Sequence, residues 1–194
     1  MLIVITAENL VENEVQILKT FASYPITIHV RKPKWSQEEL NKWLLQFTNL
    51  ETSKMMLHQH HELSTSFKIK GLHYTEQHKV QPNLKTELEQ QKKFGLTLSA
   101  TFHVLKEAEN QILFDYGVLS PVFDSISKKN YEGKLFRIQK NQKPIIALGG
   151  IKDDNIAQTK SLGYDGIAVL GNIWKSNNPI KAFDDLFKVY QIHY

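Results

Sequence analysis

Residues 144–172 read PIIALGGIKDDNIAQTKSLGYDGIAVLGN, and this stretch decides the fold class. Two short apolar runs, 144–148 and 165–169, each lead into a glycine and enclose an amphipathic segment of helical length. A nearly continuous apolar run is typical of a parallel strand that is buried on both faces. The stretch therefore predicts a strand–helix–strand unit of a parallel sheet.

The same alternation extends along the whole chain. Six further apolar runs make eight in total: 2–6, 26–30, 54–58, 69–73, 95–99 and 114–119. Helices are expected between them, at 9–21, after an N-cap at Ser36, at 61–67, at 83–91, from 153 or 154 to about 163, and from Pro179. Eight alternations favour a single closed (β/α)8 TIM barrel over residues 1–194, and a doubly wound open sheet is the competing fold.

Composition excludes several classes of protein. The chain has 194 residues, of which 41% are apolar and 23% are charged, as in one ordinary globular domain. It lacks cysteine, which excludes a disulfide scaffold, a zinc ribbon and a thiol nucleophile. No apolar run approaches the ~20 residues of a membrane span, and the start lacks a basic signal-type region. We expect a cytoplasmic protein with no membrane partner.

The charge pattern points to a local anion site. The formal net charge is +4, and the basic residues are not concentrated in one block. A nucleic-acid-binding arm would need such a block, so we expect no nucleic-acid partner. A small anionic ligand is the more natural interpretation.

The last two strand ends predict a phosphate site. Functional residues of a barrel follow the C-terminal ends of its strands, and here these positions hold Gly149, Gly150 and Ile151, then Gly171 and Asn172. Glycine lets backbone N–H groups approach a phosphate closely. We expect a phosphate between these loops, with glycines that only make tight turns as the alternative. On this interpretation Gly150→Val blocks the ligand and leaves the fold largely intact.

Three cations stand at strand ends on the same side of the predicted barrel. Arg31 and Lys32 follow the run 26–30, and Lys128 lies in the loop after 114–119. Arginine grips phosphate through two parallel hydrogen bonds, so Arg31 is an expected ligand-binding residue, and Lys128 is expected to reach the anion. For Lys32, a solvated loop charge is the favoured interpretation.

Four histidines crowd two neighbouring strand ends. They are His58, His60 and His61 after one run and His73 at the end of the next. A His-x-His pair on a strand points both rings the same way, which suits zinc or iron. Neutral, hydrogen-bonded histidines are the favoured alternative, so no metal site is predicted.

His103 has a different prediction. It lies just past the run 95–99, beside Thr101, where a side chain reaches the barrel mouth. Histidine titrates near neutrality, which suits proton transfer. A solvent-facing histidine at a helix start is the alternative.

Taken in order, these motifs resemble the thiamine phosphate synthase/TenI superfamily of barrels along nearly the whole chain. The matching segments are 4–6, 29–31, 71–73, 101–103, 114–116, 120–123, 124–128, 147–151, 155–156 and 163–169. The resemblance implies a TIM barrel and a role in thiamine biosynthesis. It also implies either condensation of a pyrimidine diphosphate with a thiazole phosphate, assisted by Mg²⁺, or tautomerisation of a thiazole phosphate without a metal.

The chain departs from the synthase pattern at its charged positions. The resemblance implies that Arg31 keeps a pyrophosphate-binding arginine, whereas the lysine expected two residues later is Pro33. The Asn-Asp pair after the third strand is His58-Gln59, and the aspartate after the fourth aligns near His78. Magnesium prefers carboxylate and other oxygen ligands. The two magnesium carboxylates of the pattern are therefore missing.

The thiazole-phosphate half of the pattern remains. The resemblance implies that His103 is the acid/base of a TenI-like tautomerase. The implied ligand-binding residues are Arg31, His58, Thr101, Lys128, Gly149, Gly150, Ile151, Gly171 and Asn172. We expect a TenI-like thiazole phosphate tautomerase that needs no metal. Alternatives are a divergent Mg²⁺-dependent synthase, a non-catalytic binding or regulatory barrel, and a metal-dependent hydrolase that uses His58, His60 and His73. The oligomeric state stays open, with a homo-oligomer as one option.

Overall fold

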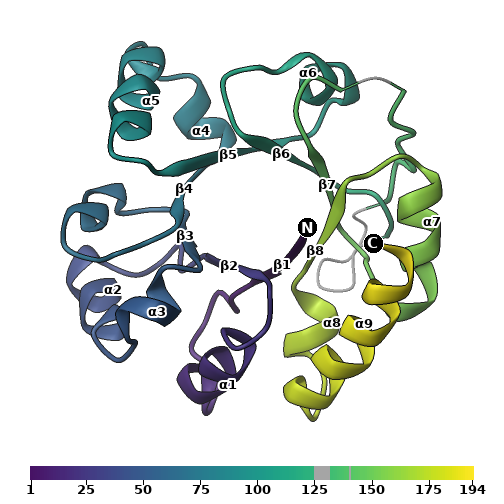
Figure 1. Ribbon diagram of the computed structural model, residues 1–194, viewed down its shortest axis with the longest axis horizontal. Coiled ribbons are helices and arrows are strands. Elements are labelled where there is room, and N and C mark those ends of the chain that lie inside the picture. The colour runs from purple at the N-terminus through teal and green to yellow at the C-terminus, as the bar shows by residue number, and fades with distance from the viewer. Residues whose placement is uncertain (125–131, 140) are drawn as a thin grey trace. The chain divides into compact units, whose positions relative to one another are not determined.

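The computed structural model describes residues 1–124, 132–139 and 141–194. Its strands follow one another in the order β1 to β8 in a closed barrel (Figure 1), and the ladders between neighbouring strands are parallel. The predicted TIM barrel is confirmed. The strands are β1 (Leu2–Ile5), β2 (Thr27–Val30), β3 (Met55–Leu57), β4 (Gly71–Tyr74), β5 (Thr97–Phe102), β6 (Tyr116–Leu119), β7 (Ile145–Leu148) and β8 (Gly166–Val169).

Helical segments connect the strands. The α-helices are α1 (Glu14–Phe21), α2 (Gln37–Leu44), α3 (Asn49–Thr52), α4 (Glu76–Lys79), α5 (Leu84–Lys93), α6 (Leu105–Asn110), α7 (Ile156–Ser161), α8 (Gly171–Trp174) and α9 (Pro179–His193). Two short 3-10 helices, η1 (His61–Thr65) and η2 (Asp153–Asn155), complete the described helices. None of the helices in the described ranges combines the length and apolar character that crossing a membrane requires.

The chain divides into two compact units. The N-terminal unit is Val4–Leu98, and the C-terminal unit is Met1–Ile3 together with Ser99–Tyr194. In the N-terminal unit, β2, β3 and β4 form a ladder in which Val30 pairs with Leu57 and Leu57 with Leu72. In the C-terminal unit, β5 to β8 form a second ladder. The prediction of a single domain over 1–194 stays a prediction.

Burial explains why the apolar runs form strands. Every residue of β1, β2, β3, β4, β6 and β8 is buried. Strands covered on both faces are mostly apolar, as the sequence pattern indicated, and Thr27, His29 and His73 are buried polar exceptions. In the C-terminal unit α7, α8 and α9 pack beside β7 and β8 (Figure 1), and Phe183 and Leu186 of α9 are fully buried.

Local capping sets several helix starts. The Ser36 side chain accepts a hydrogen bond from the Glu39 amide, and the Glu39 carboxylate accepts one from the Ser36 amide. This reciprocal pair satisfies two amides that the helix leaves open, so α2 begins where the sequence predicted. Likewise, Pro179 is the first residue of α9, after the N-cap Asn178.

Most element boundaries are shifted from the predicted ones, and three of these shifts have an identifiable physical cause. The helix expected at 9–21 begins only at Glu14, because Asn13 has a left-handed backbone (φ 58°) and the carbonyls of Ala7 and Asn9 point at Lys32. The fourth strand ends at Tyr74 and the fifth at Phe102, later than the apolar runs indicated. Polar residues inside these strands conceal their true ends, since apolar content alone defined the runs.

Candidate functional site

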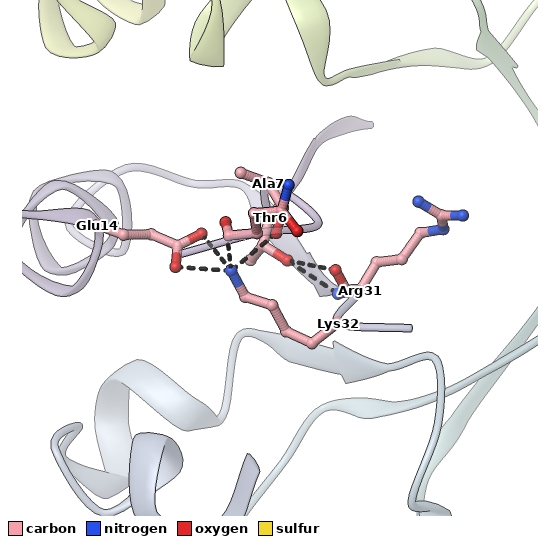
Figure 2. A network of polar contacts seen from close by, with 6 residues as sticks. Thr6, Ala7, Glu14, Arg31 and Lys32 are labelled. Carbon is pink, nitrogen blue, oxygen red and sulfur yellow. Dashed lines mark hydrogen bonds and ion pairs between the residues drawn. The ribbon is translucent and has the colours of Figure 1, made fainter. Parts of the chain in front are cut away.

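The end of β2 separates two neighbouring cations. The Arg31 amide donates to Thr6 Oγ1 at 2.9 Å, which fixes the backbone at this strand end. In Figure 2 the side chains of Arg31 and Lys32 extend away from each other, as alternation along an extended strand requires. The Arg31 side chain is 33% exposed, and its guanidinium pairs with the carboxylate of Glu8. Arg31 is therefore accessible to a ligand, but an anion has to displace Glu8.

Lys32 corrects the prediction of a solvated charge. Its side chain is fully buried, and its Nζ lies 2.7 Å from each carboxylate oxygen of Glu14 (Figure 2). It also donates to the carbonyl of Ala7 at 2.7 Å, and it lies 4.9 Å from the ring centroid of Trp35. The prediction was wrong because the compensating carboxylate lies on α1, where no local pattern around Lys32 reveals it.

Burial works against both charges of this pair. Removal from water raises the pKa of Glu14 and lowers the pKa of Lys32, and their mutual contact opposes both shifts. An isolated buried charge is costly, so each partner depends on the other. The pair ties the β1–α1 loop, which also carries Glu8, to the end of β2.

A cluster of three buried histidines lies in the same unit. His29 comes from β2, His58 directly follows β3, and His73 comes from β4. His29 Nδ1 lies 2.9 Å from His58 Nε2, and the His58 and His73 rings stack with centroids 4.1 Å apart. One ligand atom from each ring lies within 4.8 Å of the other two. We call these residues the histidine cluster.

The predicted His-x-His pair does not form. β3 ends at Leu57, and His60 has a left-handed backbone with φ 54°, so the strand alternation stops between His58 and His60. His60 Nε2 donates to the carbonyl of Trp35 at 2.7 Å instead. His61 Nε2 lies 3.2 Å from the carbonyl of His73 and donates to it, so His61 supports the histidine cluster from outside.

The histidine cluster is held in its neutral form. Burial, followed by the charge of Lys70, lowers the pKa of His29 to about 3. Burial is also the main reason why the pKa values of His58 and His73 lie well below the usual value, and the charge of Arg31 adds to both shifts. Burial, and then the charge of His78, lowers the pKa of His61 to about 4. Neutral imidazoles keep a nitrogen lone pair for a proton or a metal.

His103 is held in a defined orientation in the C-terminal unit. Its Nδ1 lies 2.9 Å from the carbonyl oxygen of Ser120, which can only accept, so Nδ1 carries the proton. Nε2 is then the nitrogen that faces away from this carbonyl and can exchange a proton. The ring borders an open groove whose lining includes Lys106, Lys134 and Phe136, but not Thr101. Thr101 lies on β5, where it pairs with Val118 of β6.

The glycine pair after β7 packs against the loop that follows β6. Gly149 and Gly150 have positive φ angles of 105° and 66°. A Cβ atom on Gly149 would lie 3.0 Å from Pro121 Cα, and one on Gly150 would lie 2.3 Å from the carbonyl oxygen of Asp124. Contact with the chain's own backbone therefore explains both glycines. This corrects the expectation that Gly150→Val leaves the fold largely intact.

Open amides nevertheless remain at the predicted phosphate loops. Among residues 1–124, 132–139 and 141–194, the amides of Gly149, Gly150 and Ile151 donate no hydrogen bond, and neither do those of Gly171 and Asn172. The residues at both loops are half-buried apart from Ile151, which is buried. Such amides suit an anionic oxygen ligand.

Two side chains hold this region in shape. Asn155 Nδ2 donates to the carbonyl of Gly150, and Asn155 Oδ1 accepts from the amide of Lys152. Asn172 Nδ2 donates to Asp153 Oδ1 at 3.2 Å. The predicted ligand Lys128 lies outside the described residues.

Two residues of these sites were missed in the sequence. His29 falls within the matching segment 29–31, but the predicted histidine group contains only His58, His60, His61 and His73. Its alternation with Arg31 along β2 was the signal that places it on the same side of the sheet. Glu8 carried no comparable signal, because it lies in a loop.

The sequence model of one protein family matches most of the chain. This family is described as thiamine monophosphate synthase, and the match covers residues 2–173. The chain belongs to this family. A thiamine-phosphate synthase from Actinobacillus succinogenes is 25% identical over 131 residues, which are 64% of this chain and 59% of that protein. The match thus spans less than two thirds of that relative.

Solved structures support the fold of this family member. The thiamine phosphate pyrophosphorylase from Bacteroides thetaiotaomicron superimposes with a TM-score of 0.73 at 21% identity and covers 100% of this chain and 98% of its own. The one from Pyrococcus furiosus has a TM-score of 0.76 at 20% identity, with 98% of this chain and 95% of its own covered. At such identities the likeness shows the fold alone.

Lys32→Met should strongly destabilise this family member. It leaves the buried Glu14 carboxylate without its partner, which costs about 3–5 kcal/mol in the free energy of unfolding. Urea denaturation followed by tryptophan fluorescence measures this loss. Replacing Glu14 by Met as well should restore most of it, whereas Lys181→Met, which breaks the exposed pair with Asp185, should have far less effect. A Lys32→Met protein that is as stable as the wild type would contradict the buried ion pair between Lys32 and Glu14.

Acid should destabilise the protein through its buried histidines. Because the folded pKa values of His29 and His61 are lowered to about 3 and 4, the unfolded chain binds more protons below its usual histidine pKa. The contribution of these rings to the free energy of unfolding is fully present above about pH 6.5 and decreases as the pH is lowered. At pH 5 the loss is about 2 kcal/mol for each buried neutral ring. Urea titrations across this range measure it.

The matched variant for this pH dependence is His61→Gln. The glutamine amide keeps a donor for the His73 carbonyl, whereas the substitution removes one titrating group. The free energy of unfolding should therefore fall less steeply between about pH 6.5 and pH 5. A wild-type free energy of unfolding that stays level from about pH 7 to pH 5 contradicts the buried neutral state.

Proposed function

We propose that this protein is a TenI-like enzyme of thiamine biosynthesis that binds a thiazole phosphate and tautomerises it by proton transfer. The observation that carries the proposal lies within the C-terminal unit. Residues 120–124 contact both the His103 ring and the glycine loop after β7. The Ser120 carbonyl accepts a hydrogen bond from His103, and the backbone of 121–124 packs on Gly149 and Gly150. A proton-transferring ring and open amides therefore adjoin one short segment.

The amides after β7 and β8 are the proposed phosphate site. Backbone N–H groups without an internal partner bind phosphate oxygens without adding a mobile side chain. The amides of Gly149, Gly150 and Ile151 stand on the loop after β7, and those of Gly171 and Asn172 on the first turn of α8. Lys128 remains a proposed further contact to the phosphate.

His103 is the proposed acid and base. Its Nε2 takes a proton from the thiazole ring precursor and then returns a proton at another ring position, so the number of protons is unchanged. Ser120 keeps Nδ1 protonated and fixes the ring orientation throughout. Lys106 and Lys134 at the same groove supply positive charge for a carboxylate on the substrate.

Condensation of a pyrimidine diphosphate with a thiazole phosphate is another candidate, favoured because the relatives are named thiamine-phosphate synthases. That reaction in the resembled family is assisted by magnesium, a cation that prefers carboxylate oxygens. Gln59 and His78 stand where the resemblance expects the two magnesium carboxylates; Gln59 offers one neutral oxygen, whereas the His78 imidazole does not suit this ion. Condensation is therefore the second candidate. A binding protein without catalysis is the third.

Asn172→Asp should weaken binding of a thiazole phosphate. The new carboxylate stands beside the proposed phosphate amides and also repels Asp153, which now accepts from Asn172. We expect the dissociation constant to rise at least about tenfold, equivalent to about 1.4 kcal/mol. Isothermal titration calorimetry measures it, and Asn172→Ser is the uncharged control. Unchanged affinity of the aspartate variant would place the phosphate elsewhere.

His103→Ala should abolish most tautomerisation. Positioned general acid–base catalysis contributes about 10²–10⁴-fold, so kcat should fall by that factor while thiazole phosphate binding changes little. Proton exchange at the thiazole ring, followed by NMR, measures the reaction. His193→Ala, at the end of α9, is the control.

Full activity of His103→Ala would overturn the acid–base assignment. Condensation of both substrates with magnesium at about 1 per second or faster would favour the second candidate instead. Binding without either reaction would favour the third.

A further inference from the structure

The histidine cluster has the layout of a ligand set. His29, His58 and His73 belong to three strands or strand ends that lie next to one another in the N-terminal unit. All three side chains are buried, with exposed fractions of 1%, 7% and 2%. One nitrogen from each ring lies within 4.8 Å of the other two. Side chains on adjacent strands of a packed unit are held in place, so this convergence is a fixed property of the fold.

The spacing of the nitrogens is close to that of a metal site. Zinc–nitrogen bonds of 2.0–2.1 Å in a tetrahedron put neighbouring ligand nitrogens about 3.4 Å apart. His29 Nδ1 and His58 Nε2 share a hydrogen bond at 2.9 Å, slightly closer than this value, so a bound ion takes the place of the shared proton, which moves to the other nitrogen of its ring. The widest separation within the cluster is at most 4.8 Å. Metal binding therefore needs the His29 and His58 nitrogens to move apart by only about 0.5 Å.

We propose that His29, His58 and His73 bind one zinc-class divalent cation through three imidazole nitrogens. Imidazole suits zinc and its transition-metal neighbours, whereas magnesium and calcium prefer oxygen ligands. Three protein ligands leave one tetrahedral position open. The site goes beyond the proposed function, since proton transfer by His103 uses residues of the C-terminal unit and needs no metal.

The charges around the histidine cluster favour an anion as the fourth ligand of the bound cation. The positive charge of Lys70 acts on His29, and that of Arg31 acts on His58 and His73. His61 and His78 face the cluster as further imidazoles, and His61 donates to the carbonyl of His73. A dication in this positive setting is favoured when an anionic oxygen occupies its open position. Inorganic phosphate should therefore tighten metal binding.

Metal titration of the intact chain tests the site. The purified, chelator-treated protein is titrated with cobalt(II) and followed by visible absorption, and then with zinc chloride in a calorimeter, with and without inorganic phosphate. We expect one equivalent per chain, the intense absorption of four-coordinate cobalt, and loss of that absorption when zinc is added. Long-range imidazole nitrogen NMR of the wild type should show three shifted rings. None of these readouts depends on enzyme activity.

Matched histidine variants locate the bound ion. His29→Gln, His58→Gln and His73→Gln should each weaken zinc binding by more than about 100-fold, because loss of a direct ligand exceeds the effect of its supporting contacts. His60→Gln is the control, since its ring contacts the Trp35 carbonyl and not the cluster. Circular dichroism shows which variants fold.

Two results would overturn the proposal. One is a wild-type protein that binds neither cobalt nor zinc stoichiometrically, with or without phosphate. The other is a bound metal that shifts no cluster ring, or that His60→Gln removes as effectively as the cluster variants do. The wild-type spectra decide the question even if a cluster variant does not fold.

Discussion

Alternation of side chains along β2 governs the polar architecture of the N-terminal unit. Successive residues of an extended backbone point to opposite sides, so His29 of β2 and Arg31, which directly follows β2, share one side while Lys32 takes the other. Figure 2 shows the Arg31 and Lys32 side chains extending apart. The parallel register carries this rule to the neighbouring strands, where His58 and His73 stand in the row that continues from Arg31. Lys32 and its buried ion pair with Glu14 thus lie on one side of this backbone, and the histidine cluster lies on the other.

The two sides balance their charges by different means. Lys32 is neutralised by direct contact with Glu14, and Arg31 is paired with Glu8 at the surface. The histidines avoid charge altogether, because burial disfavours their protonated forms. The cluster therefore adds imidazole lone pairs to the unit without adding positive charge. Neutral imidazoles beside positive side chains suit a metal cation that also binds an anion.

The sequence predicts the barrel well, because the buried parallel strands and the Ser36 capping box are both encoded within a few neighbouring residues. It fails where a partner is distant in the chain. Lys32 is misassigned because Glu14 lies 18 residues away on a helix whose start was also misplaced. His29 joins the cluster only through the register of β2 with β3, and His60 leaves it through a left-handed backbone that no His-x-His pattern reveals.

The buried amine of Lys32 has a consequence for chemical modification. Amine-acylating reagents reach the exposed lysines of the native chain, but the Lys32 Nζ is enclosed by Glu14, the Ala7 carbonyl and the Trp35 ring. Its acylation therefore requires the β1–α1 loop to open, and the rate of labelling at this one residue reports how often the loop opens. Mass spectrometry of the peptide that contains Lys32 measures this labelling rate, and with it the frequency of local opening beside Arg31.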